Sequence, residues 1–475
     1  MKTGPISRKL CHLLAASLLF AAIASAQEKN KTEIDLQTAR GTITEVATLD
    51  DPAQSYALYL PPQYSPDRRW PVIYAFDPFA RGKTAVEVYR EAAERYGYIV
   101  AGSNNARNGP TAPALEAAQA MWNDTHRRLS IDKDRTYTTG LSGGARVATA
   151  FALYCYTCAV TGVIAHGATY PVNVNQKLET NDHFLYYVAI GDEDFNYPEA
   201  VALRRKKDEA GAPYKIKVYP GPHQWAPPEV AADALEWLNL KAMQAGTEKA
   251  DPAFVNKLFE AAKTEAAQAE QHGDAMSQFY ALHSLAFDFK GLKDITEFEK
   301  KLAQFKSSKA WKDALHKEQR EIEDQATLTT TAAGQLQQLG SDQESQTGLR
   351  NDLARTFADL RHRSKSGGSE HRAASRALMQ LWIQGIEAGQ DKFRSGLFSQ
   401  AILYFDLMSE AAPDQAWPLV LLAEAHARAG NKKSALKALE EAEHRGIKNP
   451  QALAQDPELQ TLSSDPAFQK IVQGK

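Results

Sequence analysis

Residues 136–145, TYTTGLSGGA, contain the pattern Gly-x-Ser-x-Gly between a β-rich run and a run of small residues. This order is typical of a strand that turns sharply into a helix, with the serine at the turn. In so sharp a turn, side chains two residues before and two residues after the serine would collide, which accounts for Gly140 and Gly144. The pattern therefore predicts that Ser142 projects its hydroxyl above the edge of a sheet, although a plain strand-to-helix turn is the alternative.

The sequence around this turn alternates short β-rich runs with helix-length segments over residues 42–243. Such alternation is typical of an α/β domain built on a mostly parallel sheet. Asp51-Pro52 separates the first two runs and suits a hairpin, so we expect an antiparallel start followed by parallel strands. The eight expected strands are residues 42–48, 55–60, 71–76, 98–102, 135–140, 160–166, 184–190 and 214–219.

Residues for a base and an acid follow the serine in the chain. A serine hydroxyl becomes an effective nucleophile when a base takes its proton and a carboxylate orients that base. The seventh expected strand leads into Gly191-Asp192-Glu193-Asp194, and the eighth leads to His223, so both groups are expected at the carboxyl edge of the sheet. His166, at the end of the sixth strand, is the rival base, and a structural histidine is the alternative for it.

The order serine, acid, histidine, together with the Gly-x-Ser-x-Gly turn, resembles the α/β-hydrolase superfamily. Within it, residues 40–245 are similar to the serine esterases of the branch that contains feruloyl esterases, polyhydroxybutyrate depolymerases and dienelactone hydrolases. In those enzymes the acid follows the penultimate strand in a Gly-x-x-Asp pattern, which selects Asp194 over Asp192. The resemblance implies a Ser142–His223–Asp194 triad that works through an acyl-enzyme intermediate.

Acyl transfer also requires donors for the negative charge that develops on the substrate oxygen. The Gly143 N–H, at the start of the helix after the serine, is expected to be one donor. The second donor is expected after the third strand, where Asp77-Pro78-Phe79 stands in place of the HGGG pattern of lipases and esterases. Because proline has no N–H, we expect Phe79 to supply it.

Three further residues are candidates for substrate binding. Asn104 and Asn105 follow the fourth strand, where a solvated loop is the alternative, and Trp225 follows the expected base. The sequence has no metal-ligand spacing among its histidines, cysteines and acidic residues, and no phosphate-cradling loop, so we expect neither a metal nor a cofactor.

Cys155 and Cys158 form a Cys-x-x-Cys pattern at the expected end of the helix after the serine. Beside a thioredoxin-like pattern this spacing would indicate redox chemistry, but this domain is of another type. An inert pair and a structural disulfide are the two interpretations. An oxidising compartment favours the disulfide, whereas an i, i+3 pair inside a regular helix has awkward geometry.

The N-terminus has the features of an export signal. Basic residues precede an apolar run, 10–23, that closes on Ala24-Ser25-Ala26, so we expect a signal peptide over residues 1–26. An N-terminal membrane anchor is the alternative, but the run is shorter than the roughly 20 residues that a spanning helix needs. We therefore expect a periplasmic or secreted protein with no transmembrane segment in the mature chain. With a net charge of -3, nucleic acid is a poor partner.

The strand signals end near residue 245, and helix-forming residues dominate from there to the C-terminus. We expect a helical region over 246–363 and helical repeats over 370–475. At a shift of 34 residues, the second part aligns with itself in a pattern that resembles the tetratricopeptide repeat, although ordinary helical hairpins are the alternative. The aligned residues are Arg394, Gly396, Ala401 and Phe405 with Arg428, Gly430, Ala435 and Leu439.

Together these features predict an α/β-hydrolase domain followed by an all-α, tetratricopeptide-like domain. The predicted function is that of an exported serine hydrolase whose substrate is a carboxylic ester. The helical domain is expected either to shape access to the active site or to bind a protein or peptide partner. The alternatives are a serine peptidase of the same fold and a non-catalytic protein that binds partners through its repeats.

Overall fold

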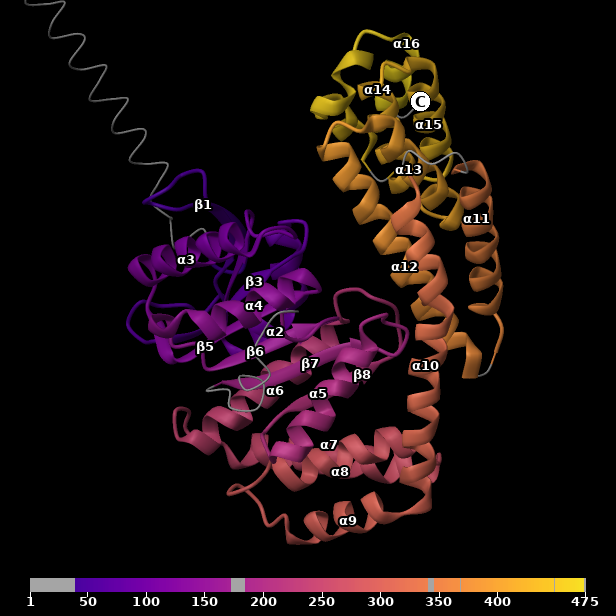
Figure 1. Ribbon diagram of the computed structural model, residues 1–475. Coiled ribbons are helices and arrows are strands. Elements are labelled where there is room, and N and C mark those ends of the chain that lie inside the picture. Colours follow the sequence, from indigo (N-terminus) through magenta and orange to yellow (C-terminus); the bar gives the residue numbers. More distant parts are fainter. Residues whose placement is uncertain (1–38, 172–183, 341–345, 368, 448, 474–475) are drawn as a thin grey trace, which may run out of the picture. The chain divides into compact units, whose positions relative to one another are not determined.

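A computed structural model of the chain describes residues 39–171, 184–340, 346–367, 369–447 and 449–473 (Figure 1). The predicted signal peptide, residues 1–26, lies outside these ranges. Within them, no helix combines the length and the apolar character needed to cross a membrane.

The described chain begins with strands and helices in alternation and continues with helices. The strands are β1 (Ile43–Ala47), β2 (Ser55–Tyr59), β3 (Trp70–Phe76), β4 (Ile99–Ser103), β5 (Ile131–Leu141), β6 (Gly162–His166), β7 (Leu185–Gly191) and β8 (Lys215–Tyr219). The helices among and directly after them are α2 (Gly82–Tyr96), α3 (Thr111–Arg128), α4 (Gly143–Tyr154), the 3-10 helix η1 (Tyr156–Cys158), α5 (Tyr197–Ala210), α6 (Pro228–Ala245), α7 (Pro252–Gln271), α8 (Ala275–Phe287) and α9 (Thr296–Ser307). The remaining helices are α10 (Lys309–Gln338), α11 (Gln346–Arg363), α12 (Ser369–Arg394), α13 (Phe398–Ala411), α14 (Trp417–Arg428), α15 (Lys432–His444), the 3-10 helices η2 (Pro450–Gln455) and η3 (Pro457–Leu462), and α16 (Pro466–Gln473).

The eight strands form one sheet in the order β1-β2-β4-β3-β5-β6-β7-β8. β2 is antiparallel to both β1 and β4, and every other neighbouring pair is parallel. The predicted strands, their antiparallel start and the parallel remainder are confirmed. The predicted fold class, an α/β domain followed by an all-helical region, is confirmed as well.

Helices cover both faces of the sheet. Ile73 of β3 packs in one core with residues of α2 and α6. The next residue, Tyr74, faces the other side, where its hydroxyl lies 2.7 Å from Oγ1 of Thr125 in α3. Successive side chains of a strand point to opposite faces, so both faces of the central strands are buried. Burial on both faces explains why these strands read as nearly continuous apolar runs in the sequence.

The chain divides into two compact units, and the first extends beyond the predicted domain boundary at residue 245. It contains the sheet, its flanking helices and also α7, α8 and α9, up to Ser308. The reason is long-range packing, because Leu240 of α6 shares a core with Val255, Phe259 and Leu285. Nε1 of the buried Trp237 also donates to Asp288, just after α8, over 2.7 Å.

The second unit contains the helices from Lys309 onward and two short segments of the loops that follow β7 and β8, Asp192–Pro198 and Pro220–His223. Its core is built from the inner faces of α10 to α16. Two of the aligned repeat positions, Ala401 and Ala435, are fully buried in the second helix of each hairpin. The glycines that precede these helices have positive φ values. The resemblance to tetratricopeptide repeats stays a prediction.

Candidate active site

Ser142 lies in the turn between β5 and α4, with φ of 54° and ψ of -119°. Non-glycine residues rarely adopt a positive φ, and holding one there costs about 1–3 kcal/mol that the surrounding fold must offset. A Cβ atom on Gly140 would lie 2.2 Å from the carbonyl oxygen of Gly144, and one on Gly144 would lie 2.1 Å from that of Phe76. The two glycines therefore permit the close backbone approach that this turn requires.

Backbone hydrogen bonds fix the turn on both sides. The Ser142 N–H donates to the His166 carbonyl over 2.8 Å, and the Ser142 carbonyl accepts from the N–H groups of Ala145 and Arg146. Because α4 begins at Gly143, the first N–H groups of the helix and the positive end of its dipole directly follow the serine. A negative charge that develops next to Ser142 would therefore be stabilised.

Asp194 and His223 form a hydrogen-bonded pair in the second unit. Both carboxylate oxygens of Asp194 lie 2.9 Å from Nδ1 of His223. Asp194 is fully buried, and its Oδ1 also accepts from the Asn196 N–H over 2.8 Å. A buried carboxylate at Nδ1 favours the tautomer in which Nδ1 carries the proton, which leaves Nε2 as a proton acceptor. The Phe195 ring lies 4.4 Å from the imidazole, centroid to centroid.

The loops that carry this pair are joined to each other. The Gly221 N–H donates to Oδ1 of Asp192 over 3.0 Å, and the Glu193 N–H donates to the Gly221 carbonyl over the same distance. Asp192, the other acidic candidate, therefore connects the two loops, while Asp194 faces the imidazole.

The strand register relates these loops to Ser142 through the sheet. Leu141 of β5 pairs with His166 of β6, which pairs with Ala189 of β7. Gly191, at the end of β7, pairs with Tyr219 at the end of β8. The chain segments that lead to Ser142, Asp194 and His223 thus leave one parallel sheet at its carboxyl edge. The structure joins Asp194 to His223 in the second compact unit, and Ser142 belongs to the first.

His166, the rival base, has a structural environment. It is fully buried, and its Nε2 lies 2.6 Å from the hydroxyl of Tyr89. Burial lowers the pKa of His166 to about 3, so its imidazole is neutral at physiological pH. A histidine without access to solvent cannot exchange protons with a substrate, which favours His223 as the base.

The residues expected to bind substrate make contacts within the fold. Nδ2 of Asn104 donates to Glu45 over 2.6 Å, and Oδ1 of Asn105 accepts from the Ser55 N–H over 2.8 Å. Both asparagines therefore attach the loop after β4 to β1 and β2. Nε1 of Trp225 donates to Oδ2 of Asp77 over 2.9 Å. These polar groups are engaged in holding loops together.

The donor expected from Phe79 is also engaged, since its N–H donates to Oδ1 of Asp77 over 2.9 Å. Sequence reasoning missed a different residue, Asn108, which lies against the turn of Ser142. A Cβ atom on Gly143 would lie 1.8 Å from Oδ1 of Asn108, so the carboxamide covers the Cα atom of that glycine. The Asn108 N–H donates to the Pro78 carbonyl over 2.8 Å, which fixes the loop there.

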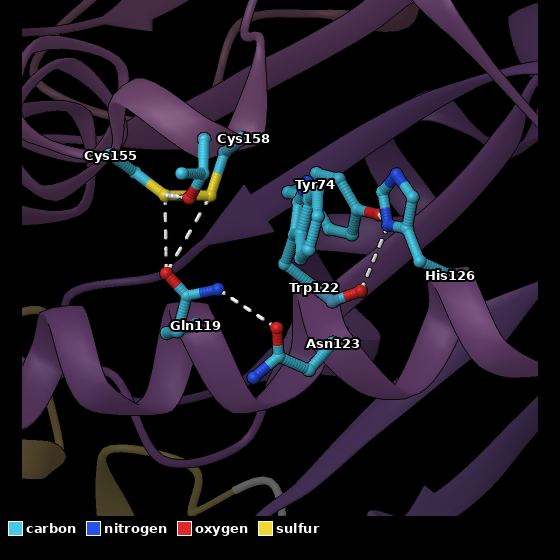
Figure 2. Close-up of a disulfide and its surroundings, with 8 residues drawn as sticks. Tyr74, Gln119, Trp122, Asn123, His126, Cys155 and Cys158 are labelled. Atoms are coloured by element: carbon cyan, nitrogen blue, oxygen red, sulfur yellow. Dashed lines mark hydrogen bonds between the residues drawn. A yellow bond between two sulfur atoms is a disulfide. The ribbon is translucent and has the colours of Figure 1, made fainter.

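Cys155 and Cys158 form a disulfide bond, with their Cα atoms 5.3 Å apart (Figure 2). The awkward geometry expected of a regular helix does not arise, because α4 ends at Tyr154 and a 3-10 turn holds the second cysteine. Gln119 of α3 points its amide oxygen at both sulfurs, at 3.1 and 3.6 Å. Across the described ranges, no group of three or more histidine, cysteine or acidic residues could hold a metal ion.

No protein-family model and no curated protein matches the chain. Among solved structures it is similar to S-formylglutathione hydrolase from Staphylococcus aureus, with 14% identity, 42% of this chain and 96% of that chain covered, and a TM-score of 0.34. It is also similar to dipeptidyl peptidase 4 from Porphyromonas gingivalis, with 12% identity, coverages of 42% and 35%, and a TM-score of 0.34. A third similar structure is a dienelactone hydrolase-like promiscuous phosphotriesterase from metagenomic libraries, with 13% identity, coverages of 41% and 93%, and a TM-score of 0.34. Each similarity covers less than half of this chain, so we base the functional proposal on the geometry of the site.

Proposed function

We propose that this protein is a serine hydrolase that cleaves carboxylic esters through an acyl-enzyme intermediate. The observation that carries the proposal is the conformation of Ser142, held at positive φ in a turn that leaves no room for side chains at positions 140 and 144. In this mechanism Ser142 Oγ attacks the acyl carbon while His223 Nε2 takes its proton. Asp194 stabilises the resulting imidazolium through its bond to Nδ1, and His223 then protonates the leaving alcohol.

The same cycle, with water as the nucleophile, releases the acid. His223 takes a proton from water, the hydroxide attacks the acyl carbon, and Ser142 leaves with the proton that His223 returns. Every proton therefore passes through one imidazole, whose orientation depends on Asp194. This dependence makes the position of the loop around Asp194 important to the rate.

The charge that develops on the carbonyl oxygen requires two donors, and we assign them to the Gly143 N–H and the Asn108 carboxamide. The N–H of Phe79 would first have to leave Asp77, whereas Asn108 already lies against Gly143. Oxygen and nitrogen of a carboxamide are interchangeable by rotation, so Nδ2 can face the substrate. Removing one such donor typically lowers kcat by about 10²–10³-fold.

We place the mature enzyme in the periplasm or outside the cell, after removal of residues 1–26. The Cys155–Cys158 disulfide supports this location, because disulfides persist in oxidising compartments.

The proposed function is tested with a fluorophosphonate probe and a panel of acyl esters, aryl esters and peptide amides. We expect the probe to label Ser142 and the Ser142→Ala variant to lose labelling and on the order of 10⁶-fold in kcat. Ser364→Ala, which removes a half-buried hydroxyl of the second unit that donates to the Arg361 carbonyl over 3.0 Å, is the control and should keep the labelling and turnover of the unmodified protein. Full labelling of Ser142→Ala would refute the assignment, and faster turnover of amides than of esters would favour the peptidase alternative.

A further inference from the structure

Helices α10 and α12 hold the loop that carries Asp194. Arg376 of α12 has 1% of its surface exposed, and its Nε donates to the Asp192 carbonyl over 2.8 Å. A second guanidinium nitrogen, Nη2, donates to the same oxygen. The guanidinium carbon also lies 4.0 Å from the centroid of the Tyr197 ring, on the other side of Asp194 in the chain. One buried side chain thus contacts the loop before and after the acid.

Three more contacts attach the same loop to these helices. Nε2 of Gln325, in α10, donates to the Phe195 carbonyl over 2.9 Å. The Tyr197 hydroxyl donates to Glu318 over 3.0 Å, and Nε2 of His371 lies 2.9 Å from Oε1 of Glu193. Residues on both sides of Asp194 are therefore fixed by side chains from a part of the chain more than one hundred residues away.

A buried arginine is a poor choice for stability alone. Removing a guanidinium from water is costly, and apolar residues of similar volume often serve as well in a packed core. Within the described residues, Arg376 forms an ion pair with Glu321, but at 4.0 Å, and Glu321 is also paired with Arg372 at 2.6 Å. Unlike an apolar residue, Arg376 can fix the orientation of the groups it contacts, because its planar guanidinium has several donors in a fixed geometry.

We propose that Arg376 and Gln325 are positioning residues of the active site, which hold the loop 192–198 so that the Asp194 carboxylate faces Nδ1 of His223. This inference rests on the proposed function, since it assigns the two side chains a role in that chemistry. It gives the helices of the second unit a role in catalysis that requires neither a cap over the active site nor a bound partner. The His223 ring is affected as well, because Phe195, whose carbonyl Gln325 holds, packs against it.

The test compares Arg376→Ala and Gln325→Met with Arg350→Ala in the full chain. Arg350, in α11, is the matched control, because its ion pairs are with Asp406 and Glu410 and not with the loop 192–198. We expect Arg376→Ala to lower ester kcat by about 10²-fold with little change in KM, as a misplaced catalytic group does. Millimolar methylguanidinium should restore part of the loss in Arg376→Ala and none in Arg350→Ala.

The pH profile of kcat/KM distinguishes positioning from a change of charge. Its acid limb reflects protonation of the catalytic base in the free enzyme. If the carboxylate of Asp194 moves away, the imidazolium loses stabilisation and the limb moves to lower pH. If the variant acted only through the lost positive charge of Arg376, the limb would move the other way, because removing a cation favours the imidazolium. The other ionisable side chains near the loop, unchanged in the variant, are Asp192, Glu193, Glu318, Glu321, His371 and Arg372.

Each outcome bears on the proposal. A lower kcat with rescue, or with the acid limb at lower pH, supports it. A profile like that of Arg350→Ala overturns it, and so does a loss of activity with neither rescue nor this shift, which indicates a general structural role. If thermal unfolding shows that Arg376→Ala does not fold, the test rests on Gln325→Met. A shift of its acid limb to lower pH then supports the proposal, and the absence of this shift overturns it. If the unmodified protein has no Ser142-dependent turnover, the proposed function fails first.

Discussion

Replacing Gly140 by alanine should destabilise the turn of Ser142 and lower its reactivity together. The added Cβ atom would lie 2.2 Å from both the carbonyl carbon and oxygen of Gly144, and 2.7 Å from the nitrogen of Ala145. All three atoms belong to the backbone, so no side chain can rotate away and the start of α4 must shift. Overpacking of this kind typically lowers the free energy of unfolding by about 1–3 kcal/mol.

The shift should also move the reacting atoms. A displacement of about 1 Å at a nucleophile can lower the rate on the order of 10²-fold. We would measure the free energy of unfolding by urea denaturation, kcat/KM on a short ester and the rate of fluorophosphonate labelling. The expected result is a decrease in all three.

Gly334→Ala is the matched control, because it is the same substitution at a helical glycine with nothing within 4 Å of the new Cβ atom. In the interior of α10 the alanine should stabilise the helix by about 0.5–1 kcal/mol and leave labelling unchanged. A Gly140→Ala protein as stable and as reactive as the unmodified one would refute the steric reasoning for this turn.

Three further changes test other parts of the molecule. Asn108→Ala should lower kcat for esters by about 10²–10³-fold without changing the melting temperature. An unchanged kcat would contradict the assignment of Asn108 and favour the Phe79 N–H as the second hydrogen-bond donor. Asp194→Asn should lower kcat on the order of 10⁴-fold by favouring the wrong tautomer of His223, while Asp192→Asn, read in the same assay, should cost far less. Burial and the neighbouring Asp456 raise the pKa of Glu424 to about 8. The folded state then holds a proton that the unfolded state releases, so this group contributes stability at low pH that is lost as pH rises towards 8. Glu424→Gln should abolish that part of the pH dependence, and parallel melting curves against pH for both proteins would contradict the assignment.

The parts of the fold that were predictable are those where one local pattern has one physical cause. β3 and β7 are buried on both faces, so their apolar runs stand out in the sequence, and the turn at Ser142 requires glycine on both sides. Asp194 and His223 were predicted because each follows a strand of one parallel sheet, and their side chains lie within hydrogen-bonding distance. In each case the residues that cause the feature are neighbours in the chain.

The missed features depend on residues that are distant in the chain. Arg376 reaches the loop after β7 across 184 positions, and nothing in the sequence near either one indicates the contact. Asn104 and Asn105 were expected near substrate because polar loop residues at a sheet edge often line sites. Their amides bond to groups of β1, β2 and the turn between them, and their contact with substrate stays a prediction. Asn108 was missed because its place against Gly143 depends on the pairing of its loop with the one after β3.

Because the first unit extends to Ser308, a truncation near residue 245 cannot by itself establish the role of the helical region. A chain that ends near residue 245 would lose α7 to α9, which share a core with α6, and Asp288, which accepts from the buried Trp237. It would lose Arg376 and Gln325 too, and with them the contacts that fix the loop around Asp194. Loss of activity in such a truncation would therefore have three possible causes. These are exposure of the core that α6 shares with α7 to α9, displacement of Asp194, and loss of a cap over the active site. Single side-chain variants in the full chain separate these causes, because each removes one contact and leaves the cores of both units in place.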